Sequence, residues 1–208
     1  NRIKSFEKLS SDKITKRIFQ GLNTGADPIF ILKLIDNGEK TIKAFSKLLN
    51  KYVVLENDMI RPLLKGADIK KWDVTNYDEI IIFPYHIKHD KAFLIEEENL
   101  KAKYPKTYDY LLQTKSKLES REHGKWKGVS NWYAFGRKSN IEQFDQDKIL
   151  IQVLANSATF ALDKGVNVLF VGGGTAGGYG IALSTESIIS SDCLIALLNS
   201  SFLDWKHH

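Results

Sequence analysis

The chain has 208 residues, 43% hydrophobic and 26% charged, with a formal net charge of +5. These values are ordinary for a soluble domain, and no apolar run is long enough to cross a bilayer. A single cysteine, Cys193 in an apolar run, excludes a disulfide framework. We therefore expect a cytoplasmic protein with a buried Cys193, and the excess of Lys and Arg modestly favours a polyanionic partner.

The first third of the chain is predicted to consist mostly of strands. Runs rich in β-branched and aromatic residues cover 17–23 and 28–36, and Asn37-Gly38 predicts a hairpin into 39–45. The stretch MIRPLLKG at 59–66 suggests a short helix that ends at its glycine. Strands are predicted again at 79–85 and 91–95.

The second half is predicted to begin with helix and to continue with strands. From 96 to 122 the pattern is helical: Pro105 suits a first turn, and one apolar face carries Tyr108, Leu111, Leu112 and Leu118. Strands are then predicted at 148–155, 159–163, 167–171 and 179–183. Ser191 or Asp192 can cap a final helix, whose apolar stripe is Leu194, Leu197, Leu198 and Phe202.

Helices and strands are grouped rather than alternating, which predicts an α+β fold. We expect mixed, mostly antiparallel sheets, a central helical segment and a C-terminal helix in one compact domain over residues 1–206. His207-His208 has the composition of a purification-tag remnant, and the chain starts without methionine. The sequence therefore suggests an excised fragment.

The stretch FVGGGTAGG at 170–178 raises the question of a cofactor site. Gly172, Gly174 and Gly177 fit the dinucleotide pattern G-x-G-x-x-G, and with Phe170 they also fit the F-x-G-x-G loop of S-adenosylmethionine-dependent methyltransferases. A dinucleotide site needs a helix to begin at the last glycines, but here a strand is predicted. The pattern alone is weak, so we expect a hairpin tip that simply turns or brings its backbone close to DNA.

Other sequence signals for a catalytic site are equally weak. Asp27-Pro28-Ile29-Phe30 comes closest to the Asn/Asp-Pro-Pro-aromatic motif of amino-methyltransferases but lacks the second proline. His86 and His89 have the spacing of metal ligands without an evident Cys pair or carboxylate cluster to join them. We therefore predict no catalytic, cofactor or metal site in this chain.

Several stretches, taken in order, carry a resemblance to a known family. They are 20–25 with Phe30, 61–69, 104–121, 131–133, 147–150, 160–163 and 197–200. The series resembles the C-terminal target-recognition domain of TaqI-like adenine-specific DNA methyltransferases and of type IIG restriction–modification enzymes. The resemblance implies a domain that reads double-stranded DNA and is itself not catalytic.

In that family an N-terminal domain of the same parent chain carries the catalytic motifs. The resemblance therefore implies that S-adenosylmethionine, and Mg²⁺ where a nuclease is fused, bind in the parent's other domains. Two alternatives stay open. One is half of a type I specificity subunit, although residues 105–122 are short for its spacer helix. The other is a small methyltransferase that uses the 170–178 loop.

Chemistry selects the candidate DNA-binding residues. Amides and forked cations read base edges, whereas lysines and hydroxyls hold phosphates. The candidates are Asn23, Thr24, Lys65, Lys70, Lys71, Lys125, Trp126, Lys127, Arg137, Lys138 and Tyr179. An Asx-type turn at 23–25 and solvated lysines are the structural alternatives. Within 121–138 we expect Trp132 and Tyr133 in the core, and Arg121 can serve a helix end.

Overall fold

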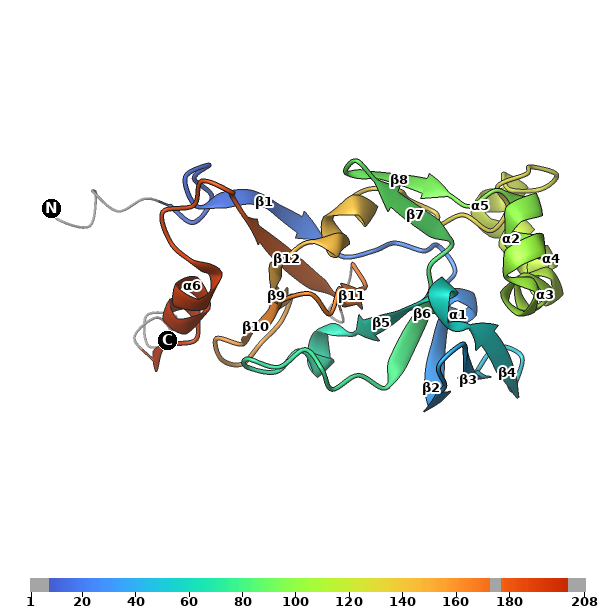
Figure 1. Cartoon of the computed structure of the whole chain (residues 1–208), viewed down its shortest axis with the longest axis horizontal. Coiled ribbons are helices and arrows are strands. Elements are labelled where there is room, and N and C mark those ends of the chain that lie inside the picture. Colours follow the sequence, from blue (N-terminus) through green and yellow to red (C-terminus); the bar gives the residue numbers. More distant parts are fainter. Residues whose placement is uncertain (1–7, 173–176, 202–208) are drawn as a thin grey trace, which may run out of the picture. The chain divides into compact units, whose positions relative to one another are not determined.

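The computed structural model describes residues 8–172 and 177–201, and its elements are drawn in Figure 1. It is an α+β fold with mostly antiparallel sheets and a C-terminal helix, as predicted. The chain forms two compact units. Unit 1 comprises 1–21, 64–76 and 143–208, and unit 2 comprises 22–63 and 77–142. No single cut in the sequence separates them, and the predicted boundary at 206 stays a prediction.

Unit 1 is built on an antiparallel sheet with the order β1-β12-β9-β10. Its strands are β1 (Thr15–Gln20), β12 (Gly178–Leu183), β9 (Lys148–Gln152) and β10 (Phe160–Asp163). The register places Ile18, Ile181, Ile149 and Leu162 in one row. Helix α6 (Ser191–Leu198) packs Leu194 and Ile195 against this face, where they form a cluster with the buried Ile149 and Ile181.

The opposite face of this sheet packs on aromatic rings. Phe19 lies on the face away from α6, with ring centroids 5.4 Å from Phe144 and 5.9 Å from Phe170. Phe144 belongs to η4 (Ile141–Asp145), and Phe170 to the short strand β11 (Leu169–Phe170). Both faces of the sheet are therefore covered over part of their area, which explains the continuous apolar run in β9.

The C-terminal helix is fixed at both ends. Ser190, one residue before the predicted cap, accepts a hydrogen bond from the Cys193 backbone N–H (3.2 Å). Beyond the helix, Asn199 exchanges two hydrogen bonds with the Phe160 backbone, at 3.0 and 2.9 Å. Ile195 rather than Leu197 faces the sheet. Phe202 lies outside the described residues.

The prediction of a buried Cys193 is wrong. Cys193 is exposed. It lies in the first turn of α6, and the buried side chains of this helix are Leu194 and Ile195. An apolar run thus did not reveal which of its members faces the sheet.

A buried ion pair lies inside unit 1. Lys148 and Asp163 are both 0% exposed, and Lys148 Nζ lies 2.5 Å from Asp163 Oδ2. Lys148 also donates to the Phe144 carbonyl (2.9 Å), while Asp163 accepts from the backbone N–H groups of 166, 167 and 168. Burial lowers the pKa of Lys148, and the Asp163 carboxylate opposes that shift. The pair ties β9 to β10 and to the turn that follows β10.

Gly172, in the 170–178 stretch, and Gly21 allow two backbone segments to pass in close contact. A Cβ on Gly21 would lie 2.4 Å from the Val171 carbonyl, and one on Gly172 would lie 2.4 Å from the Gly21 oxygen. Gly178 N donates to Val171 O (3.0 Å). A strand, β12, begins at Gly178, and of the hairpin tip predicted at 172–178, residues 173–176 lie outside the described residues.

Unit 2 contains a second antiparallel sheet, with the order β5-β6-β2-β3-β4. These strands are β5 (Ile60–Leu64), β6 (Glu79–Ile82), β2 (Ile31–Asn37), β3 (Thr41–Ser46) and β4 (Lys51–Glu56). The hairpin predicted at Asn37-Gly38 joins β2 to β3 and is confirmed. A further hairpin pairs β7 (Tyr85–Lys88) with β8 (Lys91–Leu94).

One local prediction here is wrong, and a second is confirmed only from Ile31 onward, as strand β2. The helix predicted at 59–66 is strand β5, because its backbone pairs with the apolar strand β6 and pairing overrides local propensity. It lies between two 3-10 turns, η2 (Asn57–Met59) and η3 (Gly66–Asp68). The strand predicted at 28–36 begins with a helical turn, α1 (Asp27–Phe30), which has proline in its first turn.

The helical segment predicted at 96–122 is confirmed but broken into α2 (Glu97–Lys103), α3 (Pro105–Gln113), α4 (Lys115–Glu119) and α5 (Arg121–Gly124). Its buried face includes Leu111 and Leu118, but Leu112 is exposed and Tyr110 takes its place. The Tyr110 hydroxyl donates to Ile29 O (2.7 Å). Glu56 accepts from the Lys106 N–H at the start of α3, which places an anion at a helix N-terminus.

None of the helices in the described ranges is long and apolar enough to cross a membrane. Within the same ranges, no three His, Cys, Asp or Glu side chains gather as a metal site would require.

Removing one member of the buried ion pair is expected to destabilise the protein strongly. Lys148→Met leaves a buried carboxylate without its cation and lowers the free energy of unfolding by about 3–5 kcal/mol. Asp163→Ala costs more, because it also orphans three backbone N–H groups. Urea unfolding measures both.

The matched control is Lys164→Ala, which breaks the solvent-exposed pair with Asp192 (2.7 Å). Exposed pairs contribute about 0–1 kcal/mol. Equal urea midpoints for Lys148→Met and Lys164→Ala would contradict the structural role of the buried pair.

Candidate nucleic-acid interface

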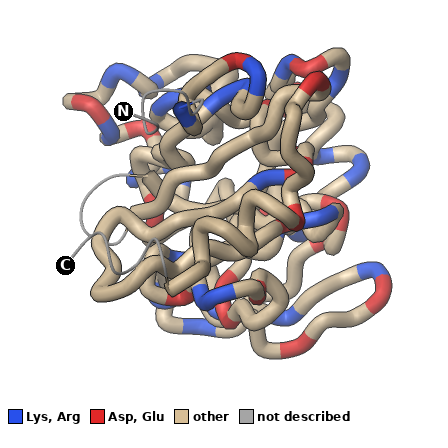
Figure 2. Tube along the Cα trace, turned by 90° about the vertical axis from the view of Figure 1, so that its left-hand side faces the viewer, with Lys and Arg blue, Asp and Glu red and all other residues tan. Residues whose placement is uncertain are grey.

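The predicted DNA-binding residues fall into two sets, one in each unit. Unit 2 holds Asn23, Thr24, Lys125, Trp126, Lys127, Arg137 and Lys138, and unit 1 holds Lys65, Lys70, Lys71 and Tyr179. Lysines and arginines alternate with acidic residues along much of the trace (Figure 2). Net charge alone therefore does not locate an interface, and local pairing of charges must be considered.

Unit 2 brings the turn at 23–25 beside the segment at 136–138. Arg137 N donates to Asn23 O (3.1 Å), which forms an isolated β-bridge, and Gly136 N donates to Thr24 O (2.8 Å). A Cβ on Gly136 would lie 3.2 Å from the Gly25 Cα, so the two backbones are in close contact. Two stretches that the sequence identified separately thus form one surface.

Arg121 holds this surface together. Its guanidinium donates to four backbone carbonyls, those of Leu118 (2.8 Å), Thr24 (3.1 Å), Ala134 (2.9 Å) and Trp132 (2.7 Å). Only arginine carries enough donors in a fixed plane for such a set. The structural role considered for Arg121 is confirmed, and it extends well beyond the end of a helix.

Glu122 organises the next residues. Glu122, His123 and Gly124 have φ of 48°, 60° and 86°, so the helix ends here in a left-handed turn. The Glu122 carboxylate accepts from Lys125 Nζ (3.1 Å) and Trp126 Nε1 (3.4 Å). Hydrogen bonding to Lys125 lowers the pKa of Glu122. The Trp126 ring lies against the Arg121 guanidinium, with 4.5 Å from Cζ to the ring centroid.

The candidate side chains differ in what they can offer a ligand. Asn23, Lys127, Arg137 and Lys138 are exposed. Asn23 Oδ1 accepts from Gly25 N (3.2 Å), which is the Asx-type turn considered as an alternative. Within the described residues, Arg137, Lys127 and Lys138 make no ion pair. We call these four residues the Asn23–Arg137 cluster, in which Arg137 is bridged to Asn23, Lys138 follows it in the chain and Lys127 belongs to the same 121–138 segment.

The assignment of Thr24 to DNA binding is corrected. Its side chain is 0% exposed, and the hydroxyl donates to Asp27 Oδ1 and accepts from Ala26 N (3.0 Å). A hydroxyl that stabilises its own turn has no access to a phosphate. Thr24 is therefore a structural residue beneath the exposed Asn23.

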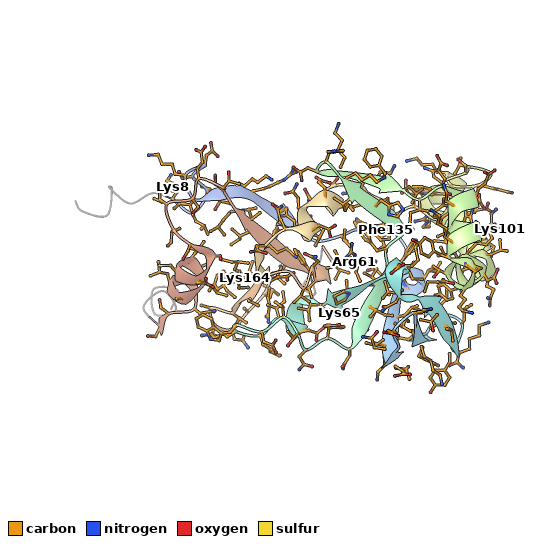
Figure 3. All side chains as sticks on the ribbon, viewed as in Figure 1. Lys8, Arg61, Lys65, Lys101, Phe135 and Lys164 are labelled. Atoms are coloured by element: carbon orange, nitrogen blue, oxygen red, sulfur yellow. The ribbon has the colours of Figure 1, made fainter. Side chains whose placement is uncertain are left out.

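Large aromatics of the 121–138 stretch form the core beneath this surface, as predicted for Trp132 and Tyr133. Both are buried, and Tyr133 donates to Ile95 O (2.5 Å). Phe135, labelled in Figure 3, packs on Phe30 and Tyr85 with centroids 5.0 and 5.1 Å apart. Tyr85 accepts from Phe135 N (2.7 Å), and burial raises the pKa of Tyr85 to about 12.

The unit 1 candidates lie on two elements. Lys65 precedes η3, and Lys70 Nζ donates to Ala67 O (3.0 Å). Lys71 is exposed, and Tyr179 is 39% exposed on β12. Trp72 has no predicted role. Its side chain is 55% exposed, and its φ is 73°. Its position directly after two lysines was the signal available.

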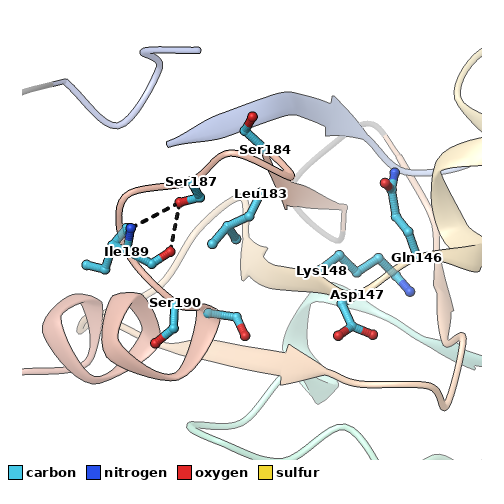
Figure 4. Close-up of a pocket in the computed structure, with 9 residues that line it drawn as sticks. Gln146, Asp147, Lys148, Leu183, Ser184, Ser187, Ile189 and Ser190 are labelled. Carbon is cyan, nitrogen blue, oxygen red and sulfur yellow. Dashed lines mark hydrogen bonds between the residues drawn. The ribbon is translucent and has the colours of Figure 1, made fainter. Parts of the chain in front are cut away.

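A pocket of about 360 Å³ in unit 1 (Figure 4) is not part of either set. Serines and the Lys148 side chain line it, but Lys148 is committed to Asp163. Ser187 Oγ donates to Ile189 O (2.7 Å), and Ser190 caps α6. These contacts hold α6 and its leading turn in place, and we assign the pocket no ligand.

No family model matches the chain. Over 161 residues it is 26% identical to the "Type II restriction enzyme and methyltransferase RM.Eco57I" of Escherichia coli. The aligned part covers 73% of this chain but only 16% of that protein. The similarity supports a relationship to restriction–modification systems.

Arg121→Lys is expected to loosen the Asn23–Arg137 cluster. A lysine cannot reach four carbonyls, so buried acceptors lose their partners, and the free energy of unfolding falls by about 2–3 kcal/mol. Amide hydrogen exchange at Gly136 and Arg137 should accelerate, because both N–H groups bond to the 23–24 turn. Lys125→Ala, which breaks only an exposed contact, is the control. Unchanged protection of both amides in Arg121→Lys would contradict the assignment.

Proposed function

We propose that this chain is a target-recognition domain that binds double-stranded DNA in a restriction–modification enzyme. It carries no methyl-transfer or cleavage chemistry of its own in this proposal. A catalytic domain of the same parent chain supplies the S-adenosylmethionine site and, where a nuclease is present, Mg²⁺. The protein acts in the cytoplasm.

One observation carries the proposal: the exposed Asn23 and Arg137 are joined by a β-bridge, on a backbone to which Arg121 is bonded. Lys138 is the next residue in the chain, and Lys127 belongs to the same 121–138 segment. DNA-reading surfaces need amide and guanidinium groups for base edges and lysines for phosphates. The cluster supplies Asn23 and Arg137 for the first task and Lys127 and Lys138 for the second. Because Arg121 bonds to the Thr24 and Ala134 carbonyls, the backbone beside Asn23 and Arg137 loses little freedom on binding.

The similarity to RM.Eco57I supports the same proposal. That protein is described as both a restriction enzyme and a methyltransferase, and this chain aligns with a small part of it. A domain of such an enzyme that is devoted to recognition would have exposed polar donors rather than a buried reactive group. The arrangement around Asn23 and Arg137 has this character.

Lys125 and Lys127, the two lysines next to Trp126, are expected to contribute differently to DNA binding. Lys125 is paired with Glu122 at 3.1 Å, whereas Lys127 makes no ion pair with any residue that the structure describes. A lysine that neutralises a phosphate releases a counterion, so its loss lowers the salt slope of binding by about one unit. Lys127→Ala should show this decrease, and Lys125→Ala should show less of it.

The experiment begins with selection of bound duplexes from a randomised pool by the 208-residue chain, at low salt. We expect weak, strongly salt-dependent binding and an enriched sequence. Arg137→Ala should cost about 1–3 kcal/mol on that sequence and little on scrambled DNA. Lys127→Ala should weaken both duplexes alike.

Lys103→Ala, which changes an exposed lysine of α2, is the control and should retain wild-type affinity and slope. Absence of any enriched sequence would count against recognition. Transfer of labelled methyl groups to DNA by the purified chain would instead show that it is an enzyme.

A further inference from the structure

A loop of unit 1 presents an aromatic ring at its exposed end. Residues 70–73, Lys-Lys-Trp-Asp, are all exposed, whereas Ile69 and Val74 on either side are buried. We call these four residues the Lys70–Asp73 tip. Lys65, labelled in Figure 3, lies at the start of the same loop.

The tip is anchored to the sheet rather than free. Gln152 Nε2, on β9, donates to Ile69 O (2.7 Å), and Trp72 N donates to Phe160 O, on β10 (3.0 Å). Phe160 is in turn bonded to Asn199. Trp72 is therefore held at a fixed place beside the edge of the sheet.

Trp72 is costly to the folded state in two ways. Its side chain is 55% exposed, although indole is among the largest apolar groups, and its φ of 73° lies in the region that favours glycine. A bulky residue in this region is a true outlier, and such residues concentrate at functional sites. Packing does not explain this tryptophan.

The charges around the ring favour an anionic partner. Lys70 and Lys71 directly precede Trp72, and Lys71 makes no ion pair within the described ranges. The nearby acids are exposed but accept local hydrogen bonds: Asp68 accepts from Lys65 N (3.0 Å), and Asp73 accepts from Thr75 N and Oγ1, both at 2.7 Å. Among the residues that the structure describes, Lys71 thus has no partner beside the exposed ring, whereas the exposed Lys70 bonds through its ammonium to Ala67 O (3.0 Å).

A second exposed aromatic lies on the same sheet. Phe160, which anchors Trp72, is opposite Ile151, and Ile151 is opposite Tyr179. Neighbouring strands are about 4.8 Å apart, so Tyr179 lies roughly 10 Å from Phe160 on the same face. The Tyr179 ring therefore lies on the face of this sheet that carries Phe160, and Trp72 is bonded through its backbone to the edge strand of the same sheet.

We propose that Trp72 stacks on an unstacked base of bound DNA while Lys70 and Lys71 bind the adjoining phosphates. Every base has a π-face, so an aromatic ring with flanking cations binds unpaired bases with little regard to sequence. Aromatic wedges at a base step are also used to deform duplexes. This proposal rests on the proposed function and adds to it a contact that is independent of base-edge reading.

The experiment compares two probes that bind the 208-residue chain: a perfect duplex and the same duplex with three central unpaired thymines. Unpaired bases need not be unstacked first, so the wild type should bind the second probe more tightly. Trp72→Ala should remove that preference, about tenfold in affinity, without changing the salt slope. Trp72→Phe should retain most of it.

Three further variants separate this role from a structural one. Lys71→Ala should keep the preference but lower the salt slope by about one unit. Trp72→Gly should lose the preference while its Tm stays equal or rises, because glycine tolerates this φ. Ile188→Ala, at an exposed apolar residue elsewhere in unit 1, should behave as the wild type.

Failure of the two proposals is distinguishable. If the wild type binds DNA but binds both probes equally, or if Trp72→Ala keeps the preference, base stacking by Trp72 is wrong and the proposed function stands. A fall in Tm for Trp72→Gly would identify a packing role for the tryptophan instead. If no DNA binds, both proposals fail.

Discussion

The candidate surface of unit 2 depends on the guanidinium of Arg121. Four carbonyl oxygens from three separate stretches, near 24, 118 and 132–134, converge on it. Without a donor each would be a polar group with poor access to water, which is expensive. One cation therefore fixes a non-repetitive segment that has no sheet or helix ladder of its own. The positions of the exposed Asn23 and Arg137 depend on this arrangement, because they neighbour the segments whose carbonyls Arg121 binds.

In unit 1 an anion, the Asp163 carboxylate, satisfies irregular backbone in a similar way. Asp163 gathers three backbone N–H groups and the Lys148 ammonium, and so closes the turn after β10. In both units a buried or half-buried charge satisfies irregular backbone, and the exposed candidates are carried on neighbouring strands or loops. Charged residues that are paired internally thus differ in function from those that face solvent, although composition counts them alike.

Much of the fold could be predicted from the sequence, since alternation and turn chemistry are local signals. The Asn37-Gly38 hairpin and the 79–82 strand are examples. The segment 60–64 was mistaken for helix because only its partner β6 shows that it is a strand. In the candidate site, basic and aromatic composition identified 121–138. It could not reveal that Thr24 is buried or that Arg137 meets Asn23, because those facts depend on long-range contacts.

Composition does not predict which aromatic residues are buried and which are exposed. Trp132 and Tyr133 are buried, and their polar atoms bond to Glu97 and to Ile95 O. Trp126 is partly covered by Arg121 and bonded to Glu122. Trp72 has a backbone anchor only, at a strained φ, and its ring is the most exposed of the three tryptophans that the structure describes. Indole is stabilised by burial and by a partner for its N–H, and Trp72 has little of either although its backbone is anchored. This contrast, together with the flanking lysines, is the basis on which we propose a base with its phosphates as the partner, since it offers both a flat apolar face and negative charge.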